Sequence, residues 1–137
     1  MYVCTSFQKI TKMKNKGISL KRLIKSFGYA FNGLRLMIIQ EQNAKLHLLA
    51  VLLVVVAGLY FQLSVFEWIV VIIVSGSVLA AEAFNTSIEA LSNAISPEFD
   101  KKIKRVKDFA AGAVLIVSLT SVIVGLIIFI PKIIALF

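Results

Sequence analysis

The sequence has few charged residues and a single cysteine. Charged side chains make up 16% of the 137 residues and apolar ones 59%, with a mean hydropathy of +0.92. Soluble domains are about 45–50% apolar, so this composition excludes a soluble enzyme and a disordered tail. The lone Cys4 excludes a disulfide scaffold, because it has no partner within the chain. What remains is a small integral membrane protein, with no room for two ordinary domains.

Several common nucleotide- and metal-binding signatures are also missing. The chain has neither a G-x-x-x-x-G-K-[ST] loop nor a G-x-G-x-x-G loop. It has no H-R-D or D-F-G set, and no cysteine and histidine spacing of the kind that binds zinc. An enzyme of this sequence that uses a nucleotide must therefore bind its phosphates without the usual glycine-rich loop.

Acidic residues are scarce beside basic ones. Seven Asp and Glu face fifteen Lys and Arg, for a formal net charge of +8. Nine basic residues lie in 1–45 and five in 101–107, so they flank the apolar segments. This placement favours an anionic membrane surface as the partner, and no nucleic acid.

Three apolar runs are long enough to cross a bilayer, which takes about 20 residues. The expected spans are about 46–66, 68–91 and 108–131, followed by a C-terminal tail at 132–137. The 92–107 link is basic, whereas the 61–67 link has no basic residue. By the positive-inside rule the N-terminus and 92–107 are cytoplasmic, and the 61–67 turn and the C-terminus are outside. Trp68 then fits an outer interfacial anchor.

The segment before the first span divides into two parts. Residues 1–17 are predicted to be a disordered basic tail. Residues of about 18–42 carry apolar side chains at steps of three and four, with basic side chains on much of the other face. This pattern predicts an amphipathic helix on the cytoplasmic surface of the membrane. A simple anchoring role for this helix is an equally good interpretation.

Acidic side chains inside the second span are the most informative residues, because a charge in the bilayer is costly. At 100° per residue, Asn85 lies about 60° and Glu89 about 20° from Glu82, and Asn93 falls in the same arc. Glu82 lies about 21 Å and Glu89 about 31 Å beyond Trp68 at 1.5 Å per residue, which puts both near the cytoplasmic interface. The plainer interpretation is a polar stripe that joins helices.

Other polar residues reach the same interface through the topology. Glu41 and Asn43 precede the first span, and Lys107 and Asp108 open the third. Carboxylates gathered in this way suit a hard divalent cation or a general base toward a hydroxyl. His47 is a weaker candidate, because a single histidine near the end of a span is more often an interface residue.

Four blocks of the sequence resemble the prokaryotic diacylglycerol kinase family. They are 28–35 (GYAFNGLR), 41–47 (EQNAKLH), 82–89 (EAFNTSIE) and 107–115 (KDFAAGAVL). The resemblance covers about 20–131, and the order and spacing of the blocks make it specific.

The resemblance implies an all-α membrane protein of the bacterial inner membrane, with a surface helix and three spans in one kinase domain at 18–131. It implies a homotrimer with active sites between subunits. It implies transfer of the γ-phosphoryl group of MgATP to the hydroxyl of a membrane lipid alcohol, either diacylglycerol or undecaprenol.

The family pattern also implies roles for individual residues. Glu82 would be the catalytic base, supported by Asn85, and Glu41 and Glu89 would hold the Mg²⁺ bound to ATP. The remaining residues that it implies at the nucleotide are Arg22, Tyr29, Glu98, Lys107 and Asp108.

The chain departs from the family at Asn93, where an Asp is usual, which could alter cation affinity or loop packing. The alanine- and glycine-rich 110–113, the ending at 128–131 and the Glu41-x-Asn43 spacing are more similar to the undecaprenol kinase branch. Two other functions stay open: a small proton- or cation-coupled transporter subunit, and a non-catalytic membrane anchor.

Overall fold

The computed structural model describes residues 19–96, 98 and 100–136, and within them the fold is entirely helical. The helices are α2 (Leu20–Gln40), α3 (Gln42–Tyr60), α4 (Val65–Ile95) and α5 (Lys101–Ile134). The last three are long and apolar enough to cross a membrane. The predicted all-α membrane fold with three spans is therefore confirmed, and the predicted tail at 1–17 lies outside the described residues.

The chain divides into two compact units, residues up to 35 and residues from 36 onward. The first contains most of α2, whose apolar and basic side chains alternate with helical spacing and are mostly exposed. This confirms the predicted helix. The second unit contains α3, α4 and α5.

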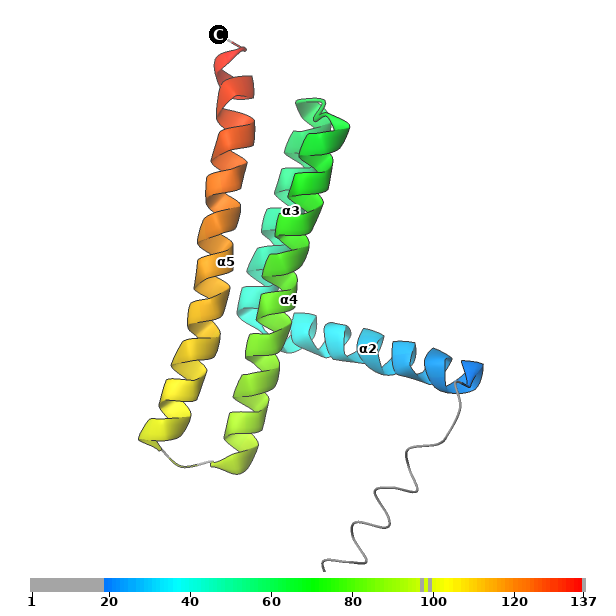
Figure 1. Ribbon diagram of the computed structural model, residues 1–137, viewed down its shortest axis with the longest axis vertical. Coiled ribbons are helices and arrows are strands. Elements are labelled where there is room, and N and C mark those ends of the chain that lie inside the picture. The colour runs from blue at the N-terminus through cyan, green and yellow to red at the C-terminus, as the bar shows by residue number, and fades with distance from the viewer. Residues whose placement is uncertain (1–18, 97, 99, 137) are drawn as a thin grey trace, which may run out of the picture. The chain divides into compact units, whose positions relative to one another are not determined.

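Successive helices of the second unit run alongside one another in alternating directions, and α4 packs against both α3 and α5 (Figure 1). Most large apolar side chains on these helices are exposed, as expected for surfaces that face lipid. At 1.5 Å per residue, the 31 residues of α4 and the 34 of α5 reach about 46 and 51 Å. Both helices are thus longer than a hydrocarbon core of about 30 Å, and they continue past the start of α3 (Figure 1).

The turn between α3 and α4 is shorter than the predicted 61–67 turn, because α3 ends at Tyr60 and α4 already begins at Val65. Gln62 adopts a left-handed φ of 52°. Its N–H donates to the Leu59 carbonyl, and the Leu63 N–H donates to the Gly58 carbonyl. This is the Schellman pattern, which usually places glycine at the left-handed position. Because Phe61 and Leu63 are apolar, hydropathy extends the predicted first span to 66, beyond the end of α3.

Trp68 closes this turn by packing its ring against Gly58. A β-carbon at Gly58 would lie 2.8 Å from Cη2 of Trp68 and 3.0 Å from Cδ1 of Leu63. The indole that the sequence marks as an interfacial anchor therefore also joins α3 to α4 within the chain.

Gly58→Ala is expected to destabilise the bundle by about 1–3 kcal/mol, the usual cost of forcing an extra methyl into a packed contact. Thermal unfolding in detergent measures the effect. Gly125→Ala is the matched control, because a β-carbon there has no neighbour within 4 Å. Equal stability of the two variants would contradict the Gly58–Trp68 packing.

Two polar ties set the register between α4 and α5. Near the α3–α4 turn, the Glu67 carboxylate forms an ion pair with Lys132 at 3.0 Å. It also caps α4 by accepting a hydrogen bond from the Ser64 N–H at 2.7 Å. At the other end, Lys107 donates to Oδ1 of Asn93 at 2.6 Å. The ties lie 26 residues apart on α4 and 25 apart on α5, so the antiparallel register is constant along both helices.

Candidate active site

Glu82 is the most deeply buried ionisable side chain among the described residues, with 1% of its surface exposed. Its Oε2 atom has no hydrogen-bond partner. A buried carboxylate without a partner is costly, so its retention on an apolar helix points to use of this group. Val78 and Asn85, one turn to either side, are buried on the same face of α4.

Asn85 lies between Glu82 and Glu89, the next acid on this face of α4. Its Nδ2 donates to Oε1 of Glu89 at 3.2 Å, which fixes the orientation of that carboxylate. The Oδ1 atom of Asn85 is buried and has no partner. Glu89 itself is half-buried, so it faces both the buried stripe and the surroundings.

Helix α3 brings a third carboxylate to the same place. Ala44 is fully buried, and it lies as far from Gly58 along α3 as Glu82 lies from Trp68 along α4. The register set by the Gly58–Trp68 contact therefore puts Ala44 level with Glu82. Glu41 begins α3 and makes no capping hydrogen bond with its side chain, so its carboxylate is available to another group.

The side chains of Glu41, His47 and Glu89 all lie within electrostatic range of Glu82. Two helices thus bring three carboxylates and one imidazole together around a buried position. Like charges at close quarters favour either a shared proton or a bound cation.

The donor set limits the kind of cation that fits. Within residues 19–96, 98 and 100–136, no group of three or more His, Cys, Asp or Glu side chains is placed to hold a metal ion. Glu41 and Glu89 can supply two carboxylates, which suits Mg²⁺ when a phosphate provides further oxygens.

Apart from the residues around Glu82, a pocket of about 380 Å³ lies between the end of α4 and the start of α5, and we call it the second pocket. It is polar, and the hydrogen bond between Lys107 and Asn93 crosses its lining. The residues around it are Asn93, Ser96, Glu98, Asp100, Ile103, Lys104 and Lys107. Cationic side chains beside an open cavity are suited to phosphate oxygens.

Comparison with known proteins gives the family of this chain. A family model described as prokaryotic diacylglycerol kinase matches residues 28–129, well over half of the chain. The chain belongs to the prokaryotic diacylglycerol kinase family. The resemblance seen in the four sequence blocks is thereby confirmed.

Similar members of this family carry two different names. The undecaprenol kinase of Bacillus subtilis (strain 168) is 35% identical over 113 residues, covering 82% of this chain and 92% of that protein. The diacylglycerol kinase of Escherichia coli (strain K12) is 32% identical over 111 residues, covering 81% and 91%. The diacylglycerol kinase of a Synechocystis species is 28% identical over 124 residues, covering 90% and 71%.

The structure places the family residues in four locations. Glu41, Glu82, Asn85 and Glu89 gather on facing parts of α3 and α4. Glu98 and Lys107 line the second pocket. Asp108 lies outside that lining and is mostly exposed, paired with Lys104 at 2.7 Å. The remaining two, Arg22 and Tyr29, lie exposed on α2 in the other unit.

Sequence reasoning missed three buried polar residues near Glu82. Ser92 is 3% exposed on α4, and the hydroxyls of Thr86 and Ser118 are buried without partners. The repeat Val71, Val78, Asn85, Ser92 at steps of seven was the available signal for Ser92. Asn93, expected on the buried arc, is instead exposed and bound to Lys107, because α5 lies beside it.

Proposed function

We propose that this protein is a lipid kinase that transfers the γ-phosphoryl group of ATP to the hydroxyl of a membrane lipid alcohol, either diacylglycerol or undecaprenol. The observation that carries the proposal is the buried carboxylate of Glu82, with an unpartnered oxygen and two further carboxylates around it. Membership of the prokaryotic diacylglycerol kinase family gives independent support.

In the proposed reaction the free Oε2 atom of Glu82 accepts the proton of the lipid hydroxyl. The hydroxyl oxygen then forms a bond to the γ-phosphorus, and the bond from that phosphorus to the bridging oxygen breaks. ADP leaves with the electron pair of the broken bond. A carboxylate that is shielded from water and has an unpartnered oxygen suits this work, because that oxygen is free to accept the proton.

Phosphoryl transfer depends mainly on positioning and on neutralising charge. Mg²⁺ bound with ATP would supply positive charge at the phosphates. Glu41 and Glu89 would hold this ion, with the Glu89 carboxylate oriented by its hydrogen bond from Asn85. Glu98 and Lys107 of the second pocket would contact the nucleotide together with Asp108. Arg22 and Tyr29 of α2 are the further nucleotide residues that the family resemblance implies.

The proposal includes an assembly and an orientation. A homotrimer with active sites between subunits would cover the polar stripe of α4, which lipid would otherwise touch. The N-terminus and the 92–107 link would face the cytoplasm and the C-terminus the outside of the bacterial inner membrane, as the distribution of basic residues predicts.

The direct test uses purified protein in mixed micelles with γ-labelled ATP and Mg²⁺. Diacylglycerol and undecaprenol are offered separately, and products are resolved by thin-layer chromatography. The proposal expects labelled phosphate on at least one of the two lipids, dependent on Mg²⁺. Label on neither lipid, from protein shown to be folded, would overturn it.

A further inference from the structure

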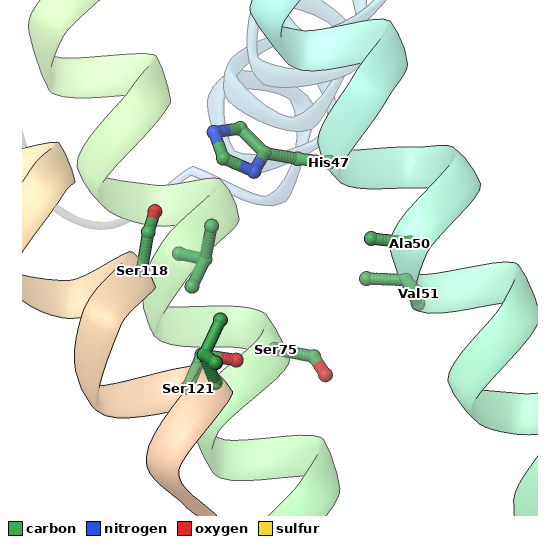
Figure 2. Close-up of a pocket in the computed structure, with 8 residues that line it drawn as sticks. His47, Ala50, Val51, Ser75, Ser118 and Ser121 are labelled. Carbon is green, nitrogen blue, oxygen red and sulfur yellow. The ribbon is translucent and has the colours of Figure 1, made fainter. Parts of the chain in front are cut away.

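A cavity of about 250 Å³ lies between α3, α4 and α5, and its wall includes Val78, one helical turn before Glu82 on α4. Its walls carry four polar side chains amid apolar ones. The residues around it are His47, Ala50, Val51, Ser75, Val78, Ser118, Ser121 and Val122. Figure 2 shows His47 directed from α3 toward the serines of α4 and α5.

One serine of this cavity, Ser118, differs from other hydroxyls on the same helices. Ser77 and Thr120 donate to the carbonyl four residues earlier, at 2.8 and 2.9 Å, as is common for hydroxyls in membrane helices. The hydroxyl of Ser118 is buried and has no hydrogen-bond partner. Such a hydroxyl has a donor available for a bound molecule, and a buried donor that forms no hydrogen bond is costly.

The helix registers place the cavity at a defined level relative to Glu82. Ser118 lies eleven residues from Lys107, and Glu82 lies eleven residues from Asn93, the partner of that lysine. Ser118 is therefore level with Glu82. Ser121 lies three residues further along α5, about 4.5 Å toward the Trp68 end at 1.5 Å per residue. His47 lies three residues beyond Ala44 on α3, at the same level as Ser121.

Ser75 and Val78 extend the cavity along the face of α4 that carries Glu82. They precede Glu82 by seven and four residues, so the three share one side of the helix. A lipid whose hydroxyl meets Glu82 would thus run its next few atoms past Ser118 and Ser121. A plain hydrocarbon chain offers no acceptor to hydrogen-bond donors at that depth.

We infer that this serine cavity binds the ester carbonyls of an acylglycerol whose free hydroxyl lies at Glu82. In a 1,2-diacylglycerol the ester groups sit on the first and the second carbon beyond the hydroxyl-bearing carbon, and both ester carbonyls accept hydrogen bonds. An undecaprenol has only hydrocarbon at that distance. The inference rests on the proposed function and makes Ser118 and Ser121 specificity-determining residues that favour the acylglycerol over the polyprenol.

The test compares three acceptors in mixed micelles: dioleoylglycerol, its ether-linked dialkyl analogue, which lacks the carbonyls, and undecaprenol. The double variant Ser118→Ala, Ser121→Ala should lower kcat/KM for dioleoylglycerol about 10- to 100-fold, as expected from loss of two hydrogen bonds. Its kcat/KM for the ether analogue and for undecaprenol should stay within about twofold of the wild type, since neither bonds the serines.

Thr120→Val is the matched control, because that hydroxyl bonds its own helix and is exposed; it should leave all three acceptors unchanged. Equal losses for the ester and ether lipids would overturn the inference, since the serines would then hold only water or the helices. Unchanged use of dioleoylglycerol by the double variant would also overturn it. Wild-type activity on undecaprenol alone would overturn this inference but uphold the proposed function, whereas no activity on any acceptor would end both.

Discussion

Glu82→Gln is expected to lower kcat for lipid phosphorylation about 100- to 10,000-fold, the usual contribution of a general base. Glutamine keeps the shape of the side chain but cannot accept the hydroxyl proton. Glu82 is buried with one unpartnered oxygen, so the substitution removes the atom that is placed to take the proton. Initial rates with γ-labelled ATP, at saturating lipid and Mg²⁺, measure the loss.

Glu67→Gln is the matched control for this experiment. It makes the same chemical change on the same helix, but at the end that pairs with Lys132. It should reduce thermal stability slightly and leave kcat within about twofold, since an ion pair at a partly exposed site contributes little. Near-normal turnover by the Glu82 variant would remove the proposed base.

Glu89→Gln is expected to raise the Mg²⁺ concentration that gives half-maximal activity by more than about 10-fold. The reason is loss of one of two carboxylates proposed for the ion, and even changes to the partners of metal ligands weaken affinity about 10- to 100-fold. Asn85→Ala should shift the same curve in the same direction, because its amide holds the Glu89 carboxylate at 3.2 Å. Activity titrated against free Mg²⁺ at fixed ATP measures both.

The magnesium titration separates this role from general damage to the site. A lowered plateau with an unchanged half-maximal Mg²⁺ concentration in Glu89→Gln would contradict its role as a ligand. The Glu67→Gln protein should reproduce the wild-type curve, because its carboxylate lies at the opposite end of α4.

Much of the fold could be predicted from the sequence because it depends on local properties. Long apolar runs require helices in a membrane, since every backbone polar group must be satisfied within its own segment. The polar stripe through Glu82 and Asn85 followed from helical periodicity, and both residues are buried as that pattern suggests. The family residues on α3 and α4 likewise came together as their shared level implied.

The rest depends on contacts between helices, which no local pattern contains. The left-handed Gln62 and the Gly58–Trp68 contact place the first turn, and an apolar sequence gives no sign of either. Asn93 was expected on the buried arc, but α5 offers Lys107 as a partner on another side. The serine cavity could not be predicted from the sequence, because it depends on the registers of α3, α4 and α5 relative to one another.

The most direct test of the account reconstitutes the protein in vesicles that contain both lipid alcohols and a trapped pH-sensitive dye. A lipid kinase with Glu82 as its base is expected to form phosphorylated lipid when MgATP is added. Glu82→Gln should abolish the product, and no proton flux should occur without nucleotide. Nucleotide-independent proton flux that is lost in Glu82→Gln, with no phosphorylated lipid formed, would contradict the account and indicate a transporter instead.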